Sequence, residues 1–243
     1  MAKQARPLFR LYRSVWASLD LLLPPTCGGC EQQGARWCVK CQAETKLLEP
    51  PWCDLCGDSL LQPGVCGHCQ AFPPHFVAAR SWASFTGPIR QAIHRLKYKR
   101  DVSLGVVLAE PLVDFYTKLN WNCDLVIPVP LGLARLKERG YNQSDLLARP
   151  LSLAVGISYQ STGLIRVYET RSQVGLTFSQ RRENVSGAFQ ALPESVSGRR
   201  VLVIDDVATS SATLDACAAA LIDAGSKEVF ALTLARAGYQ TNY

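Results

Sequence analysis

The stretch VLVIDDVATSSATL, residues 201–214, decides the fold, because an apolar run ends in two adjacent acids and then in small and hydroxyl residues. The apolar run predicts a buried strand. A helix is predicted after it, since apolar side chains recur at i, i+3, i+4, i+7 and i+8 over 214–222 and Gly225 can end it. Two further apolar runs, 124–130 and 228–236, predict strands. This order predicts a parallel sheet covered by helices.

Asp205 and Asp206 lie at the carboxyl end of their strand, where parallel α/β sheets bind ligands. Adjacent carboxylates repel each other and need a cation, donor hydroxyls or solvent as partners. Amide N–H groups at the start of the following helix favour a phosphate, and the two acids are at the distance of ribose hydroxyls. A ribose 5-phosphate therefore fits the motif. The alternative is that the acids only cap the turn.

Eight of the ten cysteines form four CxxC pairs in a segment of about 45 residues, namely Cys27/Cys30, Cys38/Cys41, Cys53/Cys56 and Cys66/Cys69. Each CxxC turn presents two thiolates to one tetrahedral ion, so eight cysteines predict two structural Zn²⁺ ions. A disulfide framework is the alternative, but it is typical of exported proteins and no export signal is evident. The turns pair either sequentially, first with second and third with fourth, or in an interleaved arrangement.

Length and composition indicate a chain that can bury a substantial core, with 243 residues, 48% of them hydrophobic, and a formal net charge of +6. No apolar run reaches the roughly 18 residues of a membrane span, so we expect none and a cytoplasmic location. Residues 1–25 predict an amphipathic helix that packs on the protein. Its apolar face comprises Leu8, Leu11, Tyr12, Val15, Leu19 and Leu22. Residues 26–72 predict a double zinc ribbon, and 76–243 the sheet domain.

Residues 201–214 resemble the signature of type I phosphoribosyltransferases that binds 5-phosphoribosyl 1-pyrophosphate (PRPP). Three more blocks resemble the ComF/GntX family, namely FTGPIRQAIHRLKYKRD (85–101), VIPVPLGLARLKERGYNQSDLLA (126–148) and LIRVYETRSQVGLTFSQRRENVSGAF (164–189). Members of this family carry an N-terminal double zinc ribbon before a phosphoribosyltransferase domain. The resemblance covers about residues 27–236. It implies an α/β fold, with a type I phosphoribosyltransferase-like parallel sheet flanked by helices.

The resemblance also implies three groups of site residues and no certain catalytic residue. The ribose hydroxyls of PRPP would contact Asp205 and Asp206, and the 5-phosphate would lie in the loop of Ala208, Thr209, Ser210, Ser211, Ala212 and Thr213. The pyrophosphate side would comprise Arg135, Arg139, Asn142 and Gln143. A flap would carry Arg166, Gln173, Arg182 and Asn184. Mg²⁺ is expected on the pyrophosphate.

Ser211 departs from the family pattern, which usually has glycine at this position of the phosphate loop. Because glycine permits close approach and unusual φ, we expect Ser211 either to loosen phosphate binding or to shift the loop, although its hydroxyl can also donate to the phosphate. The Lys and Arg side chains of 95–100 and 135–139 have a simpler interpretation as charges on helix surfaces.

The resemblance implies a role in competence, the uptake or use of external DNA, with PRPP or a related sugar phosphate as ligand. The first hypothesis is a PRPP-dependent transferase. The alternative is a catalytically inactive module that keeps the fold and binds single-stranded DNA or DNA-uptake proteins. A third is a partner scaffold.

Overall fold

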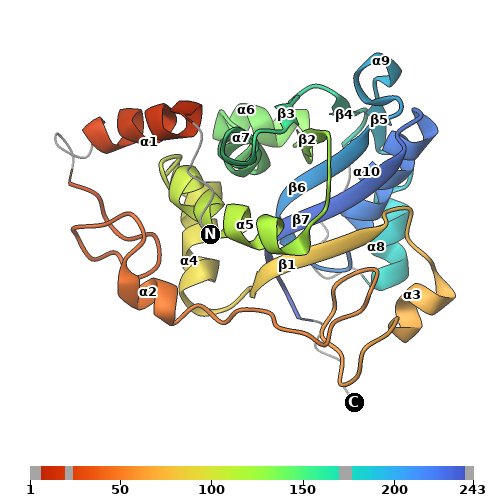
Figure 1. Cartoon of the computed structure of the whole chain (residues 1–243), viewed down its shortest axis with the longest axis horizontal. Coiled ribbons are helices and arrows are strands. Elements are labelled where there is room, and N and C mark those ends of the chain that lie inside the picture. The colour runs from red at the N-terminus through yellow and green to blue at the C-terminus, as the bar shows by residue number, and fades with distance from the viewer. Residues whose placement is uncertain (1–6, 20–23, 170–176, 239–243) are drawn as a thin grey trace.

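A five-stranded parallel sheet forms the centre of the computed structural model, which describes residues 7–19, 24–169 and 177–238 (Figure 1). Its strand order is β1-β7-β6-β2-β3, and every neighbouring pair is parallel. The strands are β1 (Ala78–Ser84), β2 (Leu125–Pro128), β3 (Ser158–Tyr159), β6 (Arg200–Ala208) and β7 (Glu228–Arg236). The predicted parallel α/β sheet is confirmed.

The central strand β6 is buried on both faces because its side chains alternate between two hydrophobic cores. Leu202 and Ile204 belong to the core with the helices α4 (Gly87–Tyr98), α5 (Leu104–Leu119) and α7 (Gln143–Val155). Val201 and Val203 belong to the other core. That core contains residues of α10 (Ala212–Asp223), α8 (Phe178–Val185) and the antiparallel pair β4 (Leu164–Arg166) and β5 (Phe189–Ala191). Figure 1 shows the two sets of helices on opposite sides of the sheet.

The second cysteine-rich segment, which contains α3 (Gly67–Ala71), shares the core of the sheet. Cys53, Cys56 and Cys69 pack in the same cluster as α10, and the Ala79 amide donates to the Leu55 carbonyl at 2.7 Å. The first segment, with α2 (Val39–Ala43), lies beside α4. Two further short helices are α6 (Leu133–Arg139) and α9 (Pro193–Val196).

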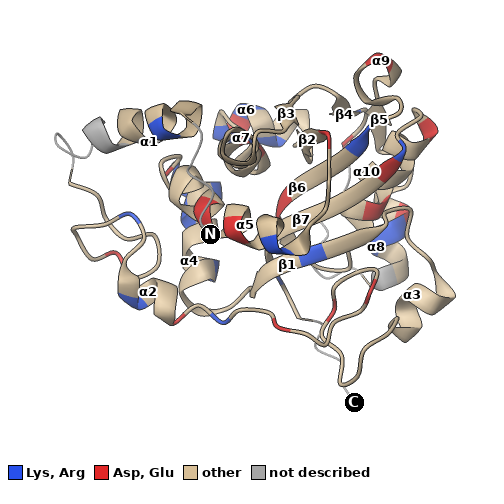
Figure 2. Ribbon diagram, in the orientation of Figure 1, with Lys and Arg blue, Asp and Glu red and all other residues tan. Residues whose placement is uncertain are grey.

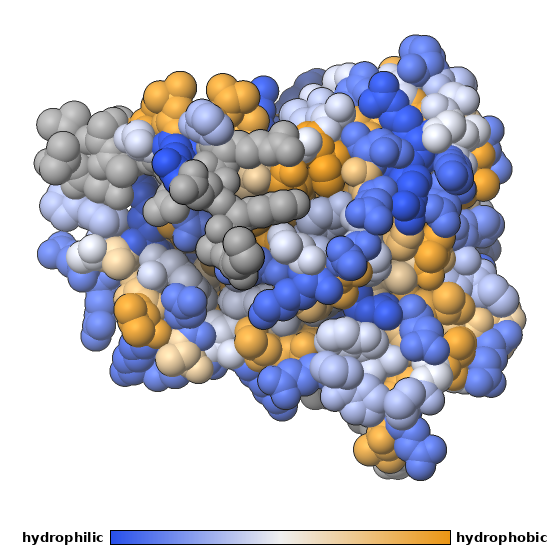
Figure 3. Space-filling view, viewed as in Figure 1, coloured by the Kyte–Doolittle hydropathy of each residue, from blue (hydrophilic) through white to orange (hydrophobic). Residues whose placement is uncertain are grey.

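The N-terminal helix α1 (Pro7–Leu19) lies against α7. The expectation that its leucine face packs on the protein is wrong, because Leu8, Leu11 and Val15 are 65%, 63% and 57% exposed. The buried side chain is Phe9, so α1 is rotated about its axis relative to the packing that we expected. Figure 3 shows apolar surface over α1, and Leu22 lies outside the described residues. No helix in the described parts of the chain is long and apolar enough to cross a bilayer.

We expect Gly57→Ala to lower the thermal midpoint of the zinc-loaded protein by several degrees more than Gly64→Ala. Both glycines have positive φ, +75° and +140°, so both variants gain backbone strain. Only at Gly57 would the new Cβ collide with the protein, 2.4 Å from the Ala79 carbonyl oxygen, whereas nothing lies within 4 Å at Gly64. Calorimetry measures both midpoints. Equal decreases in thermal midpoint for the two variants would show that close contact between Gly57 and Ala79 of β1 adds nothing to the cost of the substitution.

Candidate functional site

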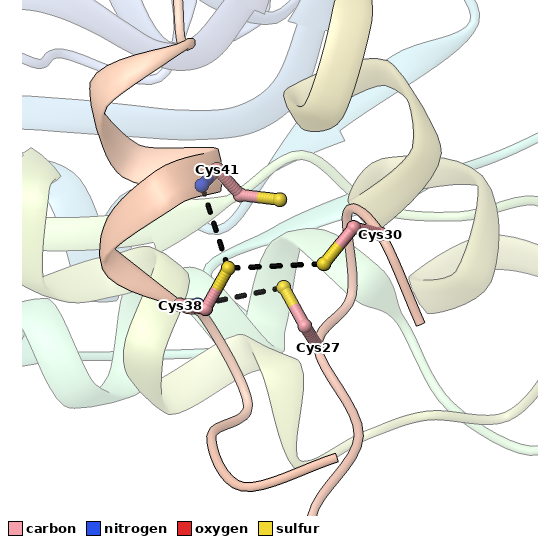
Figure 4. Close-up of side chains that lie close together, drawn as sticks. All are labelled: Cys27, Cys30, Cys38 and Cys41. Atoms are coloured by element: carbon pink, nitrogen blue, oxygen red, sulfur yellow. Dashed lines mark hydrogen bonds between the residues drawn. The ribbon is translucent and has the colours of Figure 1, made fainter. Parts of the chain in front are cut away.

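The eight cysteines form two separate clusters, and the sequential pairing is observed. The first cluster contains Cys27, Cys30, Cys38 and Cys41, and the second contains Cys53, Cys56, Cys66 and Cys69. In each cluster all four sulfurs lie within 4.8 Å of one another. Figure 4 shows the first four thiols directed toward a common centre. The interleaved arrangement is therefore wrong.

Both clusters fit a tetrahedral Zn²⁺ ion. A Zn–S bond of about 2.3 Å in tetrahedral geometry places sulfurs about 3.8 Å apart. The Sγ atoms of Cys30 and Cys38 are 3.8 Å apart, and those of Cys56 and Cys66 are 3.7 Å apart. In the first cluster the Cys38 amide also donates to Cys27 Sγ at 3.4 Å, as expected for a thiolate ligand. Four thiolates leave no open position for a substrate, so each zinc ion would be structural.

A cavity of about 570 Å³ opens at the carboxyl ends of β2 and β6. Most of the residues that the sequence predicted for sugar phosphate binding line it, namely Asp205, Asp206, Ala208, Thr209, Ser211, Ala212, Thr213, Arg135, Arg139, Gln143 and Arg166. Gln173 lies outside the described residues, and Ser210, Asn142, Arg182 and Asn184 do not line this cavity.

The partner of the acid pair is a lysine. Lys97 Nζ from α4 lies 2.7 Å from Asp206 Oδ2, and the side chains of Lys97 and Asp206 are 22% and 4% exposed. Desolvation lowers the pKa of Lys97, but attraction to Asp206 and then to Asp205 outweighs it, so this pKa is raised. The interpretation of Lys97 as a helix-surface charge is therefore wrong.

Asp205 has a different environment from its neighbour. Its Oδ1 accepts hydrogen bonds from Ser144 Oγ at 2.7 Å and from the Asp206 amide at 2.9 Å. Desolvation and then the charge of Asp206 raise the pKa of Asp205 to about 7, against the lowering effects of Ser144 and Lys97. At neutral pH the Asp205 carboxyl is therefore partly protonated.

Ser144 and Lys97 are the residues that sequence reasoning missed at the acids. The signal for Lys97 was present, because it follows Ile93 by four residues and Ile89 by eight, and both isoleucines are fully buried. Lys97 therefore continues the buried stripe of α4. No comparable signal exists for Ser144, whose partner is 61 residues away in the sequence.

The wall of the cavity that α6 supplies is basic, because Arg135 and Arg139 line it. Arg139 Nη1 donates to Gln143 Oε1 at 2.7 Å, and its guanidinium lies 5.1 Å from the centre of the Tyr98 ring. Figure 2 shows Lys and Arg on α4 and α6 beside the sheet. Asn142 has a structural role instead, because it accepts from the Ser144 amide at the start of α7 and donates to the Val129 carbonyl at 2.9 Å.

The predicted flap residues separate into two places. Arg166 on β4 lines the cavity, and burial lowers its pKa. Arg182 on α8 lies elsewhere, 3.9 Å from Asp215 Oδ2 and 5.0 Å from the centre of the Phe72 ring. Its neighbour Arg181, which the sequence analysis did not select, lines the cavity. Five basic side chains therefore face three acidic ones in the lining, Lys97, Arg135, Arg139, Arg166 and Arg181 against Glu138, Asp205 and Asp206. This excess suits an anionic ligand.

The predicted phosphate loop ends in a residue with unusual backbone angles. Ser211 immediately precedes α10 and has φ +60° and ψ 7°, in the left-handed region. Arg236 at the end of β7 donates to Ser211 Oγ at 3.1 Å and to the Thr209 carbonyl at 3.0 Å. Ser211 therefore has a left-handed backbone of the kind that glycine adopts most easily.

Comparisons with known proteins found a family match to the cysteine-rich segment and relatives that cover most of the chain. Residues 18–70 match the family described as Double zinc ribbon domain. DNA utilization protein YhgH of Salmonella typhimurium is 32% identical over 76% of this chain and 83% of its own length. Competence protein F of Haemophilus influenzae is 31% identical over 82% and 90%. Among solved structures, adenine phosphoribosyltransferase from Thermoanaerobacter pseudethanolicus matches 57% of this chain and 83% of its own with a TM-score of 0.36 and 13% identity.

We expect the purified protein to release two equivalents of zinc per chain, and Cys41→Ser to release one, because each cluster needs four thiolates. Zinc is measured with a colorimetric chelator after the thiols are blocked. The matched control is Cys123→Ser, since Cys123 is buried outside both clusters and its loss should leave two equivalents. Two equivalents in Cys41→Ser would contradict the assignment.

Raising the pH from 4 to 8 should destabilise the wild type by roughly 2–4 kcal/mol relative to Asp205→Asn. The unfolded carboxyl ionises near pH 4, whereas the folded one ionises at about 7, so the folded state holds the extra proton between these values. Its stabilisation is complete below pH 4 and is lost as the pH rises through 7. Urea unfolding at each pH measures the difference. If the free energies of unfolding of the two proteins changed with pH in parallel, the pKa of Asp205 would not be raised.

Proposed function

The chain belongs to the family of DNA utilization protein YhgH and competence protein F, and we propose that its cavity binds PRPP or a related ribose 5-phosphate. The observation that carries this proposal is the meeting of an acid pair, a loop at a helix N-terminus and a basic wall in one cavity. These are partners for a ribose diol, a 5-phosphate and a pyrophosphate respectively. A volume of about 570 Å³ suits a ligand of this size.

The proposed orientation follows from the residues. The ribose hydroxyls donate to Asp205 and Asp206, the acids that Ser144 and Lys97 already hold in place. The 5-phosphate accepts from amides at the start of α10. Arg135 and Arg139 then face the pyrophosphate at C1, with Gln143 fixing one guanidinium. Arg166 and Arg181 add positive charge to the same lining.

A transfer reaction in this orientation needs no protein nucleophile. The C1–oxygen bond breaks, pyrophosphate leaves with the electron pair, and a nucleophilic atom of an acceptor bonds to C1 and gives up its proton. The arginines stabilise the charge on the leaving group. Mg²⁺ would supply further neutralisation on the pyrophosphate oxygens, which suit it better than Asp206, since that carboxylate is already paired with Lys97.

The biological setting that we propose is the use of external DNA in the cytoplasm, where zinc-binding thiols stay reduced. The name of DNA utilization protein YhgH supports the link to DNA, and the name of competence protein F supports the link to competence. A second candidate function is binding of single-stranded DNA without turnover, together with DNA-uptake proteins. The basic lining of the cavity is the observation that favours it.

Calorimetric titration with Mg²⁺-PRPP tests the first candidate. We expect the zinc-loaded wild type to bind and Asp205→Asn/Asp206→Asn to bind at least 100-fold more weakly, because both acceptors for the ribose diol are lost. The matched control, Asp114→Asn/Asp223→Asn, removes two exposed carboxylates and should bind like the wild type.

A folded wild type that binds no PRPP would refute the sugar phosphate site. Titration with a single-stranded oligonucleotide over a series of salt concentrations then tests the second candidate. Affinity that falls steeply with salt and is lost in Arg135→Gln/Arg139→Gln would support it. Failure to bind either ligand at low salt would refute both.

A further inference from the structure

Ser211 is a strained point in the phosphate loop. Its left-handed backbone, φ +60° and ψ 7°, costs an L-residue roughly 1 kcal/mol or more, whereas glycine adopts it freely. The residue is 6% exposed and connects the loop directly to α10. Such a conformation persists only where the surrounding structure holds it.

Arg236 holds Ser211 in this backbone conformation. The residue is 4% exposed, and both terminal nitrogens of its guanidinium reach the loop, since Nη2 donates to Ser211 Oγ and Nη1 donates to the Thr209 carbonyl. The same group donates to the Cys56 carbonyl and lies 3.5 Å from Asp58 Oδ1, both in the second ribbon. A glycine at position 211 would need no anchor and would offer no side-chain acceptor.

We propose that Arg236 is a positioning residue that fastens Ser211 to the second zinc ribbon and thereby shapes the phosphate loop. This inference rests on the proposed sugar phosphate site. Serine and arginine together do what glycine would do alone at this position, because the hydrogen bond offsets the cost of the backbone conformation. The loop therefore depends on the ribbon, where Cys56 precedes Arg236 by 180 residues in the sequence.

The decisive test combines single and double variants, with ribose 5-phosphate as the calorimetric probe. We expect Arg236→Met to weaken binding at least tenfold, because the loop loses its anchor. Ser211→Gly in the Arg236→Met background should restore most of the affinity, since glycine needs none. The matched control is Arg80→Met, which removes a guanidinium that donates to Cys53 and Asp54 carbonyls of the same ribbon without lining the cavity. Its affinity should equal that of the wild type.

Unchanged affinity in Arg236→Met, or no rescue by Ser211→Gly, would overturn the proposal. If Arg236→Met does not fold, as judged by zinc content and thermal midpoint, Ser211→Ala and Ser211→Gly decide, since both keep the arginine. Alanine retains the strain and loses the acceptor, so it should bind several-fold more weakly than glycine. Equal affinities of these two variants would overturn the proposal.

Hydrogen exchange of the backbone over 207–214 separates this inference from the proposed function, because it needs no ligand. We expect faster exchange in Arg236→Met than in Arg80→Met. Faster exchange, with no binding of either Mg²⁺-PRPP or ribose 5-phosphate by the wild type, would refute the proposed function and uphold the positioning role. Equal exchange in the two variants would refute the positioning role even if the wild type binds ligand.

Discussion

The requirement that β6 be covered on both faces organises the molecule. A parallel strand with apolar side chains in both directions is stable only between two hydrophobic layers. One layer contains α4, α5 and α7, and the other contains α10, the β4–β5 pair and the second ribbon. The polar residues Asp205 and Asp206 come at the carboxyl end of this strand, so the same constraint that buries Val203 and Ile204 places the acids in the cavity.

Local patterns predicted the parts of the structure that local forces determine. The apolar runs located the strands, and the CxxC spacing located the thiol clusters, because ligands three residues apart can reach one ion without help from the rest of the chain. The acid pair and the small-residue loop located most of the cavity. The sequence left the pairing of the CxxC turns open, since the spacing allowed both arrangements.

What the sequence did not predict depends on contacts between distant segments. The hydrogen bonds of Arg236 join residues 56, 209 and 211 to the last strand, and no periodicity signals them. Adjacent residues on a helix also point about 100° apart. Because of this angle, Arg181 lines the cavity, whereas its neighbour Arg182, which the sequence predicted, does not. For α1 the apolar pattern predicted a helix, but it did not predict which side chains pack on α7. Phe9 is buried, whereas Leu8 and Leu11 are exposed.

The edge position of β1 has a consequence for biosynthesis. Its only strand partner in the described sheet is β7, and Ala78 pairs with Phe230, 152 residues later in the chain. At about 5–20 residues per second a ribosome needs roughly 8–30 s to cover that distance. During this time β1 and the ribbon that packs on it lack their final neighbour, and an unpaired edge strand is prone to wrong pairing. Early zinc binding would protect the nascent chain, because a folded ribbon already covers part of β1 through the hydrogen bond from Ala79 to Leu55.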